Sequence, residues 1–229
     1  MRIAKMVVLA LFAAVASGAV LAAPSGGSGG GSFEGPQREM TPEERAKAAY
    51  NRGVRAVKQA GKYEKTAAEA ANEGKQTKAL NRALSQHRKA REYFAATVRE
   101  LPQMHEAWNY LGYTSRKLGE YDVALAAYDE ALRLNPAFAE AIEYRGEAYL
   151  ALNRIEDAKN AYMNLFRDAR SFADQLISAM QQWVTERRGD PGALSSADID
   201  AFAHWIDERA TVARQTASLA VGAEQTAWN

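Results

Sequence analysis

The sequence predicts an all-α protein, a stack of antiparallel helical hairpins closed by a C-terminal helical cap. The first observation is an internal repeat, in which His105–Phe138 aligns with Ala139–Phe172. The second is that apolar residues recur at helical spacing between turn signals, both inside the repeats and on either side of them. Identical residues in this alignment include Ala107/Ala141, Tyr110/Tyr144, Gly112/Gly146, Ala124/Ala158, Tyr128/Tyr162 and Phe138/Phe172.

Composition places the chain among folded globular proteins. Of its 229 residues, 47% are hydrophobic and 25% are charged, so there is enough apolar material for a core. Cysteine is absent, so no disulfide can contribute and stability must come from packing.

Residues 1–22 are predicted to be a secretory signal peptide. Arg2 and Lys5 precede the uncharged apolar run Met6–Ala16, and Val20-Leu21-Ala22 fits a small-x-small cleavage pattern. The alternative is an uncleaved membrane anchor, because the apolar stretch is about 18 residues long, just enough to span a bilayer. We therefore expect a periplasmic or secreted protein, tethered to the membrane if the signal is retained.

Residues 23–40 are predicted to be a flexible linker. Ser25–Ser32 contains only Gly and Ser, a composition that buries nothing and behaves as a tether. The folded body is expected to start near Thr41.

Charge is distributed unevenly along the chain despite a formal net charge of +1. Arg38–Met104 has 15 Lys and Arg against 8 Asp and Glu, whereas His105–Asn229 has 12 against 19. One interpretation is solvated helix faces whose charges pair with one another. The other is an anionic partner for the basic part, either a weakly contacted membrane surface or an acidic protein. Nucleic acid is not expected as a partner of an exported protein.

Each repeat is predicted to be two helices joined by a tight turn. The turns fall at Leu118-Gly119-Glu120 and Leu152-Asn153-Arg154. Gly112 is expected where the two helices approach most closely, because a side chain there would separate them. Pro136 ends the second helix, since proline lacks an N–H and restricts the residue before it.

The repeat at 105–138 resembles the tetratricopeptide repeat. The resemblance is carried by Trp108-x2-Leu111-Gly112, then Ala124-x3-Tyr128-x2-Ala131, then Pro136. It implies a right-handed superhelical stack of hairpins. The second copy, 139–172, departs from the pattern at Arg145, normally an apolar position, and at Arg170, which replaces the proline. Arg145 either extends outward along its stem or marks altered packing.

Residues 41–104 are predicted to form a degenerate, extended first hairpin. Thr41-Pro42-Glu43-Glu44 is a helix start signal, and a turn is predicted at Ala60-Gly61-Lys62. The segment 62–100 is then too long for one repeat helix, and Glu73-Gly74-Lys75 either kinks or divides it. Ala90, Phe94 and Pro102 lie one repeat length before Ala124, Tyr128 and Pro136, as second-helix positions should.

Residues 173–229 are predicted to be capping helices with a frayed tail from about Leu219. Gly189–Gly192 ends one helix, and Ser195 or Ser196 caps the next. The apolar stripes of these two helices are Leu176, Met180 and Trp183, and then Ile199, Phe202, Trp205 and Ile206.

No catalytic, cofactor or metal site is predicted, and we expect a protein that is not an enzyme. The three histidines, His87, His105 and His204, have no metal-ligand spacing and there is no cysteine to help. The acidic residues Asp198, Asp200, Asp207 and Glu208 are interpreted as a solvated helix face.

The resemblance implies a concave groove lined by the first helices of the repeats. The exposed positions it assigns to partner binding are Glu106, Asn109, Tyr113, Arg116 and Lys117, then Glu140, Glu143, Glu147 and Leu150. This mixed and largely acidic surface favours a protein or peptide partner of basic or mixed charge. The predicted function is an exported protein-interaction scaffold. The alternative is a structural subunit of a cell-envelope complex that packs through the extended N-terminal hairpin.

Overall fold

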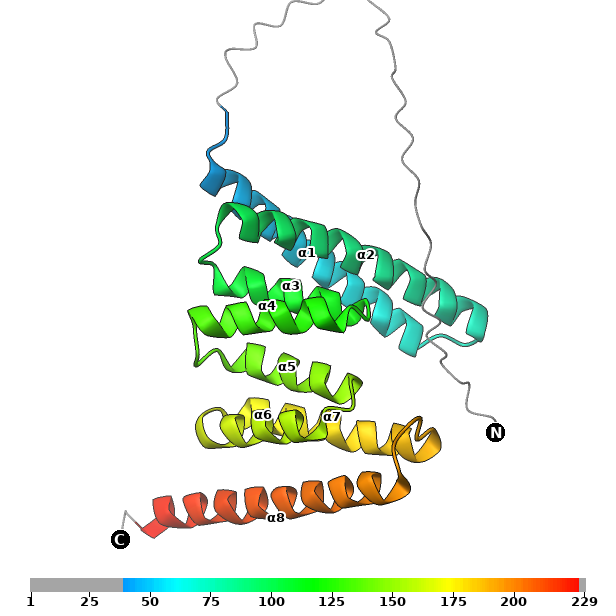
Figure 1. The fold of residues 1–229 in the computed structure, drawn as a ribbon, viewed down its shortest axis with the longest axis vertical. Helices are drawn as coiled ribbons and strands as arrows, with labels where there is room; N and C mark the ends of the chain where they lie inside the picture. Colours follow the sequence, from blue (N-terminus) through cyan, green and yellow to red (C-terminus); the bar gives the residue numbers. More distant parts are fainter. Residues whose placement is uncertain (1–38, 227–229) are drawn as a thin grey trace, which may run out of the picture. The chain divides into compact units, whose positions relative to one another are not determined.

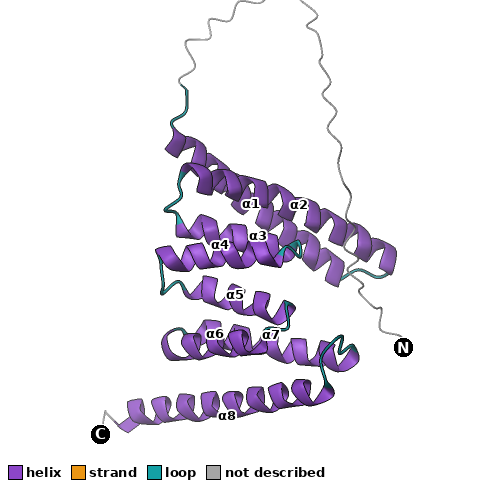
Figure 2. Cartoon of the chain, viewed as in Figure 1, coloured by secondary structure: helices purple, strands orange, loops and turns teal. Residues whose placement is uncertain are grey.

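The computed structural model describes residues 39–226, with side chains up to residue 216. This part of the chain is all helical and has no strand, as predicted (Figures 1 and 2). The helices are α1 (Pro42–Ala68), α2 (Glu73–Glu100), α3 (His105–Lys117), α4 (Tyr121–Leu134), α5 (Ala139–Ala151), α6 (Ile155–Asp168), α7 (Arg170–Gly189) and α8 (Ser196–Thr226). The predicted signal peptide and all but the last two residues of the predicted linker lie outside the described residues.

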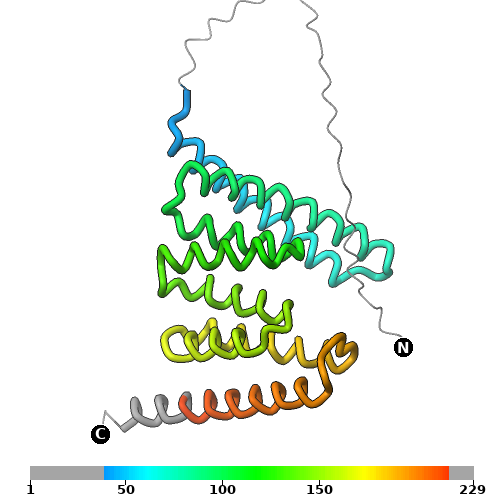
Figure 3. Tube along the Cα trace, in the orientation of Figure 1, coloured from blue at the N-terminus to red at the C-terminus, as the bar shows by residue number. Residues whose placement is uncertain are grey.

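The helices form a stack in chain order, which confirms the predicted hairpin architecture. Each helix contacts the next one in sequence, and the trace in Figure 3 passes along the stack hairpin by hairpin. In addition, α5 contacts both α3 and α7, so these helices form one layer. Among the helices in residues 39–226, none combines the length and the hydropathy that a membrane crossing requires.

Glycines set the approach of helices within the stack, as predicted for Gly112. A Cβ at Gly112 would lie 2.6 Å from the buried Tyr128 ring, and one at Gly53 would lie 2.7 Å from the Phe94 ring. The first hairpin therefore repeats the contact of the second. The third hairpin differs, because a Cβ at Gly146 would meet Leu176 of α7, at 2.7 Å.

Both predicted repeat turns are confirmed. Gly119 adopts φ +78° between α3 and α4, and Asn153 adopts φ +58° between α5 and α6. This left-handed conformation closes a helix end and suits glycine and asparagine better than other residues.

The first hairpin is extended as predicted, but its turn was placed wrongly. Helix α1 continues through Ala60-Gly61-Lys62 to Ala68, and the chain turns at 69–72, where Asn72 caps α2. Gly61 is exposed, and a Cβ added to it would have no neighbour within 4 Å. This glycine therefore destabilises the helix only through its low intrinsic helix propensity. Segment 62–100 therefore comprises the last residues of α1, the connection at 69–72 and the whole of α2. Helix α2 is uninterrupted, and Gly74 lies in its first helical turn.

Alanine forms most of the hydrophobic core of the extended hairpin. Ala60, Ala67, Ala79 and Ala83 are each at most 5% exposed, so α1 and α2 pack closely over their full length. No large apolar side chain is needed at these positions, which explains why the sequence signal for this hairpin was weak.

The C-terminal helices contain the largest apolar cluster of the described chain. Met180 and Trp183 of α7 pack with Phe202 and Ile206 of α8, and the Trp183 indole N–H donates to the Leu150 carbonyl at 2.7 Å. Ser195, one of the two predicted caps, accepts a hydrogen bond from the Asp198 N–H. Fraying from Leu219 was predicted, whereas α8 continues to Thr226.

The two departures of the second repeat have local explanations. The Arg145 guanidinium lies 2.6 Å from the Asp129 carboxylate and over the Tyr149 ring, so the side chain extends outward along its stem. Arg170 lies over the Phe166 ring, with 3.5 Å between its Cζ and the ring centroid, and begins α7 directly after the single linking residue Ala169.

Candidate partner-binding surface

Helices α3 and α5, the first helices of the two repeats, bring most of the predicted site residues together. On α3, Arg116 forms an ion pair with Glu147 of α5, and its guanidinium lies over the rings of Tyr113 and Tyr144. These two rings are themselves in contact, with centroids 5.1 Å apart. The two repeats are thus joined across their first helices by a cation held between a carboxylate and two aromatic faces.

A second group lies towards the start of α3. Tyr50 of α1 contacts Tyr110 edge to face, with ring centroids 5.9 Å apart. Burial raises the pKa of Tyr50 to about 12, and the carboxylates of Glu106 and Glu140 act in the same direction. Both glutamates therefore act electrostatically on this tyrosine, and Glu140 also acts on Tyr144, which belongs to the Arg116 cluster.

The predicted exposed positions are less exposed than expected. Asn109 is 1% exposed and Glu143 is 3% exposed, so both are buried rather than open to a groove. Leu150 is also wrong as a surface residue, because it is buried and its carbonyl accepts from Trp183. Lys117 is turned towards the first hairpin, where it pairs with Glu64 of α1 at 2.9 Å.

We use the name inner surface for the tyrosines, glutamates and arginine that α1, α3 and α5 gather here. It consists of Tyr50, Glu106, Tyr110, Tyr113, Arg116, Glu140, Glu143, Tyr144 and Glu147. Apart from Glu143, all of them are partly exposed. Its composition is four tyrosines and four glutamates against one arginine.

Burial dominates the electrostatics of this surface. It raises the pKa of Glu143 to about 9, and the neighbouring Glu147 carboxylate adds to the shift while Arg116 opposes it. Burial alone would lower the pKa of the Arg116 guanidinium, but Glu147, Tyr128 and Glu143 together raise it. Arg116 therefore stays charged, and burial together with Glu147 holds the pKa of Glu143 above its ordinary range.

Sequence reasoning missed the tyrosines of the first hairpin and of the second repeat. A usable signal existed, because Tyr50, Asn109 and Glu143 each stand at the same spacing before a hairpin glycine. That register places the three residues at equivalent positions on α1, α3 and α5. Tyr110 and Tyr144 likewise share one spacing before Gly112 and Gly146.

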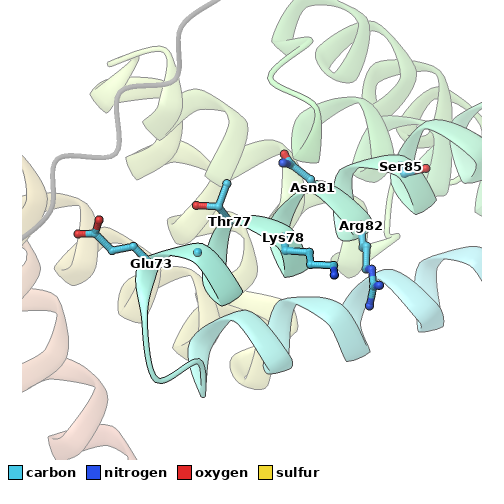
Figure 4. Close-up of a pocket in the computed structure, with 7 residues that line it drawn as sticks. Glu73, Thr77, Lys78, Asn81, Arg82 and Ser85 are labelled. Carbon is cyan, nitrogen blue, oxygen red and sulfur yellow. The ribbon is translucent and has the colours of Figure 1, made fainter.

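A shallow depression lies elsewhere, on the exposed part of α2 (Figure 4). Its lining residues are Glu73, Gly74, Thr77, Lys78, Asn81, Arg82 and Ser85. The labelled side chains stand along one helix and do not converge on a point. Within the described part of the chain, no group of three His, Asp or Glu side chains could hold a metal ion.

Comparison with protein families agrees with this geometry. The family model described as "Tetratricopeptide repeat" matches residues 105–138, which are α3 and α4 together with the turn that joins them. Such repeats generally mediate protein–protein interactions. Residues 105–138 are therefore a tetratricopeptide repeat, within an all-α helical-repeat solenoid.

Proposed function

We propose that this chain is an exported, non-catalytic interaction scaffold that binds a positively charged segment of a protein partner on its inner surface. The observation that carries the proposal is the composition of that surface, three partly exposed glutamates and four tyrosines around a single arginine. Tyrosine supplies broad apolar contact with a polar tip, a combination that is enriched at protein interfaces. The carboxylates favour a partner of opposite charge and disfavour an acidic one.

Arg116 and the adjacent Lys117, whose Nζ lies 5.9 Å from the centroid of the Tyr113 ring, are both committed to carboxylates, and Lys117 pairs with Glu64. Arg116 is paired with Glu147, and its side chain is 12% exposed. Glu106 and Glu140, in contrast, are partly exposed near Tyr50. The charge available to a ligand is therefore negative.

A charge-reversal experiment tests this proposal. The variant Glu106→Lys with Glu140→Lys should abolish binding of an oligo-arginine nonapeptide, measured by fluorescence anisotropy at low salt. The matched control is Asp122→Lys with Glu156→Lys, which makes the same charge change at exposed positions of α4 and α6. Equal loss in both variants, or in neither, would exclude a role of the inner surface.

Export is proposed on the basis of the N-terminal sequence. Its test is cell fractionation followed by N-terminal sequencing of the mature chain. A periplasmic or secreted chain that begins at Ala23 would support cleavage. An intact N-terminus in the membrane fraction would support a retained anchor, and a chain found only in the cytosol would contradict export.

A second candidate is supported by the extended hairpin. Lys75, Lys78, Arg82 and Lys89 form one exposed stripe on α2, and no described carboxylate lies within ion-pair distance of them. Figure 4 shows Lys78 and Arg82 standing on this helix. Under this candidate, the hairpin packs on an acidic subunit of an envelope complex or rests on an anionic membrane. Lys78→Glu with Arg82→Glu should then release the chain from the complex while leaving nonapeptide binding intact.

A further inference from the structure

The first hairpin stands at the end of the stack and has one uncovered side. Helices α1 and α2 have 27 and 28 residues, whereas α3 and α4 have 13 and 14, and Figure 1 shows the first hairpin projecting past the second. One side of the first hairpin packs on α3, where Tyr50 contacts Tyr110 and His87 contacts Tyr113. No helix of the described chain lies over the opposite side.

Helical spacing identifies the side chains on that uncovered side. On α2, Arg82 stands five positions before His87, which places it about 140° round the helix from the contact with α3. On α1, Tyr63 stands thirteen positions after Tyr50, which gives about the same angle. The two side chains meet, with the Arg82 guanidinium 5.7 Å from the centroid of the Tyr63 ring. We use the name end face for Tyr63 and the cations on the same side of the two helices, which are Arg52, Lys75, Lys78, Arg82 and Lys89.

The end face is cationic, and its charges are not neutralised by ion pairs. All five cations are exposed, and no described carboxylate lies within ion-pair distance of them. From Lys75 to Lys89 they extend over about 21 Å of α2. By contrast, Arg45 on the same side of α1 is paired with Glu100 at 3.2 Å. Pairing within the described chain therefore does not explain these five charges.

The side chains of the end face suit a lipid surface better than a protein surface. Protein interfaces have an apolar core and are depleted in lysine. The end face has three lysines and two arginines, whereas every large apolar side chain that is exposed in the described chain lies outside α1 and α2. Anionic phospholipid headgroups attract clusters of lysine and arginine and require no apolar anchor.

We propose that the end face docks on the anionic phospholipid surface of a membrane. This inference rests on the second candidate of the proposed function and decides between its two partners. Docking in this way leaves the inner surface open to a protein ligand, because Tyr50 and α3 lie on the other side of the hairpin.

Flotation of the full chain with phospholipid vesicles tests the docking. The vesicles contain either phosphatidylcholine alone or phosphatidylcholine mixed with phosphatidylglycerol. The ratio of the two partition coefficients isolates the effect of lipid charge from any contribution of the apolar N-terminal segment. Lys75→Gln with Lys78→Gln and Lys89→Gln should weaken binding to the anionic vesicles about a hundredfold, since each cation near an anionic lipid surface strengthens binding about fivefold.

The matched control removes the same charge elsewhere. Arg133→Gln with Arg167→Gln and Arg188→Gln changes exposed positions of α4, α6 and α7 and should bind the anionic vesicles like the wild type. Equal binding of the wild type to both kinds of vesicle would overturn the inference, and so would an equal loss in the two triple variants. Circular dichroism melts establish that each variant is folded before its flotation is interpreted.

Two soluble peptides separate the outcomes. The lysine variant should still bind the oligo-arginine nonapeptide, because Glu106 and Glu140 lie on α3 and α5 and not on the end face. If the wild type binds this nonapeptide but does not prefer anionic vesicles, the docking is refuted and the inner surface stands. An oligo-glutamate nonapeptide is the probe for an acidic protein. If it binds the wild type while anionic vesicles do not, the partner of the end face is a protein and the lipid inference is wrong.

Discussion

Substitution of Gly112 by alanine is the most direct test of how the repeats pack. The new Cβ would lie 2.6, 2.7 and 2.9 Å from three atoms of the Tyr128 ring, closer than real side chains approach. Tyr128 is 0% exposed, so its ring is enclosed and cannot swing away. The helices α3 and α4 must therefore separate, or the ring must leave its rotamer.

The magnitude follows from two opposed effects. Overpacking of this kind typically lowers the free energy of unfolding by about 1–3 kcal/mol. Because the new Cβ would contact an enclosed ring, the loss should lie at the upper end, ~3 kcal/mol. Alanine is a better helix former than glycine, and this difference raises the free energy of unfolding by about 1 kcal/mol. The expected net loss is about 2 kcal/mol, and for a domain of this size that lowers Tm by roughly 4–8 °C.

Gly61→Ala is the matched control, because Gly61 is also helical but has no neighbour within 4 Å. It should gain ~0.5–1 kcal/mol from helix propensity alone. Urea and thermal unfolding followed by circular dichroism measure both variants. The reasoning is refuted if Gly112→Ala proves as stable as Gly61→Ala.

Three further predictions concern stability. Burial raises the folded-state pKa of Glu143 to about 9 from 4.5, so the folded state retains a proton that the unfolded chain releases. The free energy of unfolding of the wild type should therefore fall as pH rises between these values. Urea titrations at pH 5, 7 and 9 should show a smaller dependence on pH for Glu143→Gln, and an unchanged dependence would contradict the raised pKa of Glu143. Thr41→Ala removes the side-chain oxygen that accepts from the Glu44 N–H at the start of α1 and should cost ~1 kcal/mol in chemical unfolding, whereas no loss would mean that the cap is frayed in solution. Trp183→Phe removes the indole N–H from the buried Leu150 carbonyl, which keeps its hydrogen bond from the Asn153 N–H, and should cost ~1 kcal/mol in chemical unfolding; no loss would mean that the indole hydrogen bond contributes nothing to stability.

The sequence was informative where a residue type has one physical explanation. Gly112 and Tyr128 predicted a close helix crossing, and Gly119 and Asn153 predicted turns, because few other residues fit those backbone or packing demands. Phe94 stands one repeat length before Tyr128, so the same packing against a glycine could be expected in the first hairpin. These positions were enough to predict the turns between α3 and α4 and between α5 and α6, whereas the predicted second repeat, 139–172, runs into α7, which begins at Arg170.

The sequence was less informative in the first hairpin. The turn predicted at Gly61 is absent, because an isolated glycine inside a helix is tolerated when nothing packs against it. The real turn follows Ala68, and its signal was an asparagine cap at Asn72 that competed with a stronger glycine pattern. The contact between α1 and α2 is also formed mainly by alanines, so the hydrophobic periodicity of these two helices is weak in the sequence.

By itself the sequence determined that this protein is a stack of helical hairpins whose first helices carry mostly acidic residues on one face. Periodicity identifies the face of each helix, and it correctly placed Arg116 and Glu147 on the same one. Only the tertiary structure decided which of these side chains are covered. Glu143 and Asn109 are buried, because neighbouring helices close over them and the guanidinium of Arg116 is drawn across to Glu147. Burial depends on what packs against a face, and that information lies in residues far away along the chain.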